Sequence, residues 1–189
     1  MKRASTDIVI AGGGVAGLTA AAAFGTAGFQ VTIIDPFPPI TTGDAAGSYL
    51  RTTAFLQPAQ QFLEAAGLWG KLSAFATPLQ VMRIVDAAAD PVVTRDFNAA
   101  DISDKPFGWN LSNWLLRREM VARLAELPKV DFRPGTGFAS MVARTAGALV
   151  TLSDGSQIDA QLLIGADGRN SPVRAACEID VKTMRYGQK

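Results

Sequence analysis

The stretch DIVIAGGGVAGLTAAAAFGTAGFQVTIID, residues 7–35, decides the fold of this chain. Its first run, Asp7–Ala11, predicts a buried strand, and the glycine-rich turn Gly12–Gly17 follows directly. The alanine-rich segment Leu18–Ala27 predicts a helix, and Gln30–Ile34 predicts a second buried strand. A strand, a tight turn, a helix and a second strand within about 30 residues form a βαβ unit. The sequence therefore predicts an α/β fold.

The glycines of this turn match the pattern G-x-G-x-x-G at Gly12, Gly14 and Gly17. In a nucleotide-binding βαβ unit the first glycine permits the tight turn. The second lets the backbone approach a pyrophosphate, and the third lets the helix pack on the strand. The helix also offers free N–H groups to the anion at its amino end. Asp35 ends the second strand, where an acidic side chain accepts hydrogen bonds from a ribose. This unit predicts dinucleotide binding, although the glycines alone do not distinguish NAD from FAD.

A second glycine-rich turn lies in LLIGADGRNSPVR, residues 162–174. Its apolar run Leu162–Ile164 ends in Gly-Ala-Asp-Gly, as a buried parallel strand does. Asp167 then follows the carboxyl end of a strand, where α/β sheets bind ligands. The alternative is that Asp167 is an ordinary turn residue. Two such turns far apart in the chain indicate a dinucleotide held from two sides.

The composition excludes several classes of function. The chain has 189 residues, 48% of them hydrophobic, and its net charge of +1 gives no electrostatic case for binding nucleic acid. It has no histidine and one cysteine, Cys177, so we predict no metal site, no disulfide within the chain and a reducing, cytoplasmic compartment. Asp7 and the glycine turn interrupt the first apolar stretch, which favours a strand over a signal peptide. No segment has the about 20 uninterrupted apolar residues that span a bilayer.

The rest of the chain predicts helices and short strands. The segment 53–66 predicts a helix, with Pro58 in its first turn or at the start of a second segment. Helical spacing of apolar residues predicts another helix at 113–127. Alternating apolar and polar residues predict antiparallel strands at 79–86 and 92–97. Further strands are expected at 130–132, 138–143, 148–153, 156–160 and, as the start of one, 185–189, with a hairpin turn at Ser153–Ser156.

These motifs resemble those of the FAD-dependent aromatic hydroxylases, which are single-component flavoprotein monooxygenases. The stretch GADGRNSPVR is similar to their Asp-Gly fingerprint, with Asp167, Gly168, Ser171 and Arg174 at the family positions. In that family the aspartate contacts FAD and also bears on NAD(P)H binding. The resemblance covers essentially the whole chain. Within the family, the segment Arg51–Leu72 and the Ser-Pro-Val-Arg ending look most like the ubiquinone-biosynthesis hydroxylases.

The resemblance also assigns residues outside the glycine turns. Arg51 is similar to the family arginine near the flavin phosphates and ribityl chain, and the alternative is a solvated loop residue. Asn113 falls where the family has a flavin-contacting polar residue, and N-capping of its helix is the alternative. No catalytic side chain is implied, because in this class the cofactor carries the chemistry. The cofactor-binding residues implied are Gly12, Gly14, Val15, Ala16, Gly17, Asp35, Arg51, Asn113, Ala139, Asp167 and Gly168.

The resemblance implies an α/β fold divided into two domains. The first is a Rossmann-like FAD-binding domain, whose parallel sheet carries helices on one face and a small antiparallel meander on the other. It is discontinuous and comprises residues 1–78 and 111–178. Residues 79–110 and 179–189 supply strands of a partial, β-rich substrate domain.

The activity that the resemblance implies is hydroxylation of an aromatic ring, with FAD as cofactor and NAD(P)H and O₂ as co-substrates. The expected substrate is a small aromatic compound or a prenylated phenol, and specifically a polyprenylated phenol of ubiquinone biosynthesis. No nucleic-acid partner is implied. The resemblance leaves open peripheral contact with the inner membrane and the formation of homo-oligomers.

One family feature has no counterpart in this sequence. The family carries a Gly-Asp flavin motif well downstream, so we expect this chain to correspond to the N-terminal half of such an enzyme. Two other functions stay open, and the missing motif favours the first of them. One is an inactive flavin-binding or assembly fragment, and the other is a different flavin enzyme, such as a halogenase or an isoprenoid-lipid reductase.

Overall fold

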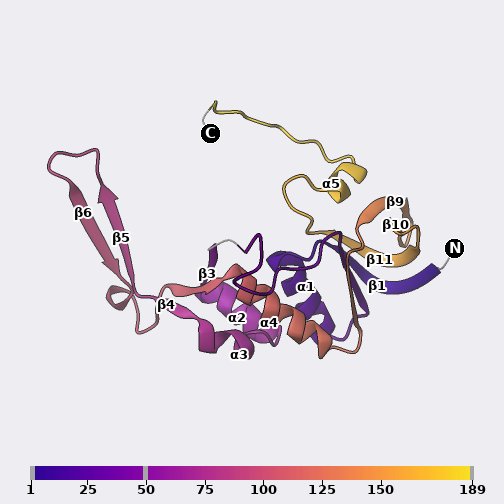
Figure 1. Cartoon of the computed structure of the whole chain (residues 1–189), viewed down its shortest axis with the longest axis horizontal. Coiled ribbons are helices and arrows are strands. Elements are labelled where there is room, and N and C mark those ends of the chain that lie inside the picture. The colour runs from indigo at the N-terminus through magenta and orange to yellow at the C-terminus, as the bar shows by residue number, and fades with distance from the viewer. Residues whose placement is uncertain (1–2, 49–50, 188–189) are drawn as a thin grey trace. The chain divides into compact units, whose positions relative to one another are not determined.

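The computed structural model describes residues 3–48 and 51–187 (Figure 1). The chain divides into two compact units. One consists of Met1–Pro39 together with Leu127–Lys189, and the other of Ile40–Glu126. Each unit has a sheet of its own.

The first unit is built on a six-stranded sheet with the strand order β8-β2-β1-β11-β10-β9. Its parallel strands are β8 (Val130–Pro134), β2 (Val31–Asp35), β1 (Arg3–Ala11) and β11 (Gln157–Gly165). The sheet continues in antiparallel fashion through β10 (Gly147–Leu152) and β9 (Phe138–Arg144). The parallel sheet and the meander predicted from the sequence are both confirmed.

The two faces of the parallel strands are covered differently. On one face lies a buried cluster shared with the meander and with α5 (Pro172–Ala176). Alternation along β1 places Ile8 and Ile10 on the opposite face, where α1 (Val15–Thr26) packs. Both faces are buried at residues 8–11 of β1 and 31–34 of β2, and these two runs are almost wholly apolar. The members of the cluster are Val9, Ala11, Ile34, Val150, Leu152, Ile158, Ala160 and Val173.

The strand β11 joins the meander to the parallel sheet. The sequence predicts two separate strands here, at 156–160 and at Leu162–Ile164, and this prediction is wrong. Gln161 does not break the chain direction, and β11 pairs with β1 on both sides of it, with Thr6 opposite Ala160 and Ile8 opposite Leu162. The first half of β11 also pairs with β10. A single strand therefore pairs in parallel with β1 and in antiparallel fashion with β10.

The predicted hairpin turn Ser153–Ser156 is confirmed between β10 and β11. Gly155 adopts a positive φ of 79°, a conformation that a glycine reaches without strain. Ser156 donates its hydroxyl to the Asp154 carboxylate at 2.6 Å and its backbone N–H at 2.9 Å. These hydrogen bonds hold the pKa of Asp154 below its usual range.

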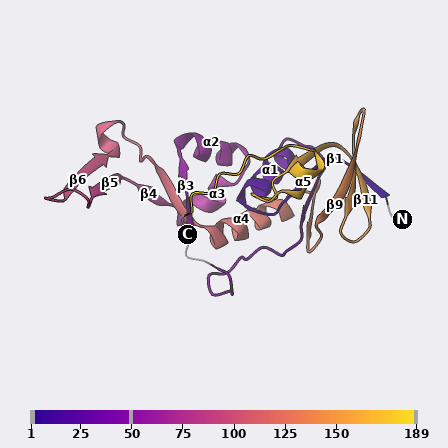
Figure 2. The same ribbon diagram turned by 90° about the horizontal axis from the view of Figure 1, so that it is seen from above.

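The second unit combines a small sheet, a hairpin and three helices. Its three-stranded antiparallel sheet has the order β3-β7-β4. The predicted antiparallel pair at 79–86 and 92–97 is confirmed as the hairpin β5 (Val81–Asp86) and β6 (Val93–Asn98). Figures 1 and 2 both show this hairpin extending away from the helices of its unit. The other elements are β3 (Thr52–Leu56), α2 (Gln57–Ala65), α3 (Trp69–Leu72), β4 (Thr77–Leu79), β7 (Gly108–Ser112) and α4 (Asn113–Ala125), with 3₁₀ turns at Ser73–Phe75 and Ala99–Asp101.

The helix predicted over 53–66 is wrong in its first four residues, which belong to β3. β3 pairs with β7, and Gly108 of β7 lies so close that a Cβ atom there would be 2.2 Å from the carbonyl oxygen of Phe55. This pairing overrides the local preference of a segment that runs straight into a helix. The helix α2 begins at Gln57, with Pro58 in its first turn as predicted.

The strand predicted from Arg185 is not formed over the described residues. Residues 179–187 form no strand, and Gln188 and Lys189 lie outside the described part of the chain. A strand needs a hydrogen-bonded neighbour, and none pairs with this segment in the part of the chain that the structure describes. The assignment of 79–110 and 179–189 to a substrate domain concerns function and stays a prediction. Among the described helices, none has the length and apolarity needed to cross a membrane.

The buried cluster gives a first prediction about stability. Ile158 is fully buried, whereas Val142 on β9 is 59% exposed. Ile158→Ala removes methyl groups from a packed core and should lower the free energy of unfolding by about 2–5 kcal/mol. The matched control Val142→Ala should change it by less than about 1 kcal/mol. Denaturant unfolding of both variants measures the difference, and equal effects would contradict this account of the core.

A second prediction concerns pH. Asp159 on β11 forms ion pairs with Arg3 and Arg144, and the hydrogen bond from Arg3 is the main cause that lowers the pKa of its carboxyl group. A carboxyl group whose pKa is lower in the folded state stabilises the fold above its unfolded pKa, and this contribution is lost as the pH falls through the folded pKa. Asp159→Asn should therefore reduce the free energy of unfolding at pH 7, and the difference from wild type should shrink below about pH 4. Urea unfolding across this range is the measurement. A difference that does not depend on pH would contradict the assignment.

Candidate functional site

The glycine turn between β1 and α1 lies directly against the second glycine turn. The backbone N–H of Ala166 donates to the carbonyl oxygen of Ala11 at 2.7 Å. Gly12 adopts a φ of +115°, and a Cβ atom there would lie 2.3 Å from the carbonyl oxygen of Ala166. Only glycine satisfies both the backbone conformation and the close approach. The two predicted turns are therefore brought together at one edge of the sheet.

The other two glycines of the pattern differ in what surrounds them. A Cβ atom at Gly17 would lie 1.8 Å from the carbonyl oxygen of Gly12, so the first turn of α1 is pressed onto the loop. Gly14 has no such neighbour within 4 Å and is the N-cap of α1, with no side chain to cap the helix. Val15 is half-buried and Ala16 is exposed in the first helical turn. The amino end of α1 is thus open to a ligand, as the pyrophosphate role requires.

Asp35, at the carboxyl end of β2, reaches back to the glycine turn. Its carboxylate accepts the backbone N–H of Gly13 at 2.6 Å and the backbone N–H of Phe37 at 2.8 Å. The side chain is half-buried. A carboxylate has about four lone-pair positions, so Asp35 holds the loop and keeps capacity for hydroxyl groups of a ribose. The predicted acid is in place, and it has a structural role that the sequence did not indicate.

The second turn places Asp167 beside the amino end of α5. Its Oδ2 atom accepts the backbone N–H of Val173 at 3.0 Å, while its Oδ1 atom is buried and has no hydrogen-bond partner among the described residues. Ser171 caps α5 by accepting the N–H of Arg174 at 2.9 Å. Gly168 adopts a φ of +88°, which glycine tolerates. A buried acceptor without a donor is energetically costly, so this atom marks a polar group that the fold alone does not satisfy.

The two turns and Asp35 line one pocket with a volume of about 480 Å³ and a mostly apolar wall. Gly12, Gly14, Asp35, Asp167 and Gly168 all lie in this wall, as predicted for a shared site. Several other lining residues are not predicted by the motifs. These residues are Pro36, Phe37, Gly137, Phe138, Ser153 and Pro172.

One feature of the sequence could have indicated some of these unpredicted lining residues. The run Pro-Phe-Pro-Pro at 36–39 places an aromatic residue directly after the acidic end of β2, in a loop. Gly137, Phe138 and Ser153 lie at the start of β9 and just after β10, far from the glycine turn in the chain, and carry no such signal. Ala139 follows the lining residue Phe138 in β9, but it is exposed and is not among the residues that line this pocket.

Arg51 and Asn113 meet within the second unit. The backbone N–H of Asn113 donates to the carbonyl oxygen of Arg51 at 3.0 Å, and the Thr53 hydroxyl donates to the Asn113 side-chain oxygen at 2.6 Å. The N-cap of α4 is Ser112, so Asn113 does not cap the helix with its side chain. Both residues line a pocket of about 260 Å³ together with Arg117 and Trp114. Two guanidinium groups at one pocket favour an anionic ligand.

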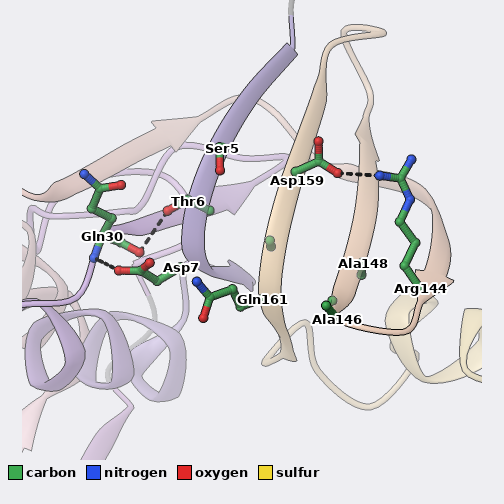
Figure 3. A pocket seen from close by; sticks show the side chains of 11 residues that line it. Ser5, Thr6, Asp7, Gln30, Arg144, Ala146, Ala148, Asp159 and Gln161 are labelled. Atoms are coloured by element: carbon green, nitrogen blue, oxygen red, sulfur yellow. Dashed lines mark hydrogen bonds and ion pairs between the residues drawn. The ribbon is translucent and has the colours of Figure 1, made fainter.

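Another pocket, along the first halves of β1 and β11, is polar but already paired (Figure 3). The Thr6 hydroxyl donates to the carbonyl oxygen of Gln30 at 2.8 Å, and the N–H of Gln30 donates to the Asp7 carboxylate at 2.7 Å. Asp159 accepts from Arg144 at 2.9 Å. Because its charged side chains hold one another or the backbone, this pocket offers little to a ligand, and the glycine turns lie at the other end of the strands.

A βαβ unit with a glycine turn, a terminal carboxylate and a second glycine turn facing it defines the first unit as a dinucleotide-binding α/β domain. The family model for the FAD binding domain matches residues 5–187, and the chain belongs to this family.

Two of the curated relatives that the chain matches are named as hydroxylases that act on ubiquinone or a ubiquinol. The chain is 34% identical to the ubiquinone hydroxylase UbiL of Rhodospirillum rubrum over 182 residues, which cover 96% of the chain and 42% of the relative. It is 28% identical to the 3-demethoxyubiquinol 3-hydroxylase of Escherichia coli, covering 100% of the chain and 48% of the relative. The chain therefore spans about half the length of the curated relatives it matches.

Solved structures show the same fold. A mutant of PqsL from Pseudomonas aeruginosa superimposes with a TM-score of 0.79 at 21% identity. The match covers 96% of this chain and 48% of that one. At this level of identity, the likeness concerns the fold alone.

The contrast between Gly14 and Gly17 can be tested directly. Gly14→Ala should leave the fold intact and cost about 1 kcal/mol or less, because φ is −75° and no atom lies near the added methyl group. It should weaken FAD binding about tenfold or more, because the methyl group occupies the surface that a pyrophosphate approaches. Gly17→Ala should prevent folding, because its methyl group overlaps a backbone oxygen. Thermal unfolding and FAD titration are the measurements. Unchanged FAD affinity in Gly14→Ala would contradict the assigned role.

Proposed function

We propose that this chain forms the FAD-binding part of a monooxygenase that hydroxylates an aromatic ring, with NAD(P)H as the reductant and O₂ as the oxidant. The proposed substrate is a polyprenylated phenol of ubiquinone biosynthesis. The observation that carries this proposal is the 34% identity to a ubiquinone hydroxylase over 96% of the chain. The pocket formed by the two glycine turns supports it independently.

The residues of the pocket fit FAD. The open backbone at Gly14 and the uncapped amino end of α1 suit a pyrophosphate, and the remaining lone pairs of Asp35 suit ribose hydroxyl groups. Asp167 lies in the pocket wall, and its buried Oδ1 atom is an acceptor without a hydrogen-bond partner among the described residues. When bound, FAD supplies the redox chemistry that no protein side chain can provide. The task of this chain is to bind the cofactor, orient it and exclude water.

The remaining proposed cofactor contacts rest on the family resemblance. Arg51 and Asn113 are proposed to contact the flavin, and their shared pocket with Arg117 supports an anion-binding role. Val15 and Ala16 offer backbone N–H groups in the first turn of α1. Ala139 is proposed as a contact through its backbone, since its side chain lies outside the pocket wall. We assign no catalytic side chain.

The proposed substrate has a consequence for location. A polyprenylated phenol is strongly apolar and partitions into membranes. An enzyme that acts on it would work at the membrane surface, so we propose peripheral contact with the inner membrane from the cytoplasmic side.

The first experiment measures the cofactor and the reaction in the protein as it is expressed. The purified protein should carry a bound flavin, visible as oxidised-flavin absorption that NAD(P)H bleaches. NAD(P)H oxidation should rise when a prenylated phenol is added, and a product with one oxygen atom from isotopically labelled O₂ should form. The control variant Val142→Ala should behave as wild type, because this exposed side chain lies outside the pockets described above.

Each outcome has a distinct meaning. A protein that takes up no FAD would overturn the cofactor assignment. A flavoprotein whose NAD(P)H oxidation is not stimulated by any phenol would overturn the hydroxylase assignment. Stimulation by simple phenols but not by prenylated ones would retain hydroxylation and overturn the substrate.

A further inference from the structure

Phe37 is a large apolar side chain that the fold leaves in water. It is 73% exposed, and it lines the pocket formed by the glycine turns. An aromatic ring at this exposure contributes little to the core, and burying it against a ligand would remove apolar surface from water. Its place in the pocket wall therefore calls for an explanation other than folding.

The backbone around Phe37 is held in place. Its N–H donates to the Asp35 carboxylate at 2.8 Å. Pro36 fixes one backbone angle before it, and Pro38 restricts Phe37 itself to an extended conformation. The ring thus extends from a stiff loop, so that little conformational entropy is lost when a ligand covers it.

The loop is also fastened to the meander. Asp35 forms a β-bridge with Thr136, and a Cβ atom at Gly137 would lie 3.2 Å from the Pro36 side chain. Phe138 follows in β9, packs against the buried cluster and lines the same pocket. The pocket therefore has two aromatic side chains beside the carboxylate that is proposed to bind the ribose. One of them is anchored in the core and the other is exposed.

We propose that Phe37 is the platform on which the adenine ring of FAD stacks. This inference rests on the proposed FAD site. If Asp35 binds the ribose, the attached base lies at the same end of the pocket. Phe37 follows Asp35 by two residues, so its exposed ring is near the position of that base. Adenine has an apolar face that stacks well on an aromatic side chain. Phe37 is thus a cofactor-binding residue that recognises the adenosine half and takes no part in the redox chemistry.

The test uses FAD and ADP, which share the adenosine and the pyrophosphate. Phe37→Ala should raise the Kd for both by about tenfold, which corresponds to about 1.4 kcal/mol. Phe37→Tyr should keep both Kd values within about twofold of wild type, because the ring remains. In Phe37→Trp, added ADP should quench the emission of the new indole. The matched control is Phe29→Ala, which removes a 45% exposed phenyl ring of the same unit that does not line this pocket.

The outcomes separate this inference from the proposed function. If wild type binds FAD, and Phe37→Ala binds both FAD and ADP as tightly as wild type does, the platform is overturned and the flavin site stands. If Phe29→Ala weakens binding as much as Phe37→Ala, the effect is a general loss of stability and the platform is again overturned. If wild type binds no FAD, the proposed function falls and the platform with it.

Discussion

The site depends on one close approach, in which the carbonyl oxygen of Ala166 lies where a side chain at Gly12 would be. Beside it, the N–H of Ala166 donates to the carbonyl oxygen of Ala11. β1 and β11 are adjacent and parallel, so both strands end at the same edge of the sheet. Their turns can meet only if one of them lacks a side chain at the contact. That requirement explains why the first glycine is needed for the fold before any ligand is considered.

Asp35 extends this arrangement to a third strand. β2 is the other neighbour of β1, so its carboxyl end lies at the same edge. By accepting the N–H groups of Gly13 and Phe37, the carboxylate fixes both the glycine turn and the loop that follows β2. A single side chain therefore positions both the glycine turn and the loop that carries the aromatic ring of Phe37. Removing its charge would disturb several parts of the site together.

The sequence predicts features that depend on neighbouring residues. The βαβ unit, the two glycine turns, Asp35 and the hairpin at Ser153–Ser156 all follow from local chemistry, and their elements are found as expected. Features that depend on distant pairing are not predicted. β3 is a strand only because β7 lies beside it, and β11 is continuous only because β1 pairs along its length. The part of the pocket wall formed by Gly137, Phe138 and Ser153 is not predicted either, because it also depends on the pairing of distant segments.

The cofactor and the substrate are recognised by different kinds of chemical group. The end of the site that is proposed to bind the pyrophosphate relies on backbone N–H groups, which residues other than proline all supply. Relatives at 28–34% identity can therefore share this cofactor site, and membership of the family speaks strongly for FAD. A substrate, by contrast, is chosen by side chains around the reacting ring, and one fold serves many substrates. The case for a polyprenylated phenol thus rests on identity to particular hydroxylases, and the case for FAD rests on the family match together with a backbone that suits a dinucleotide.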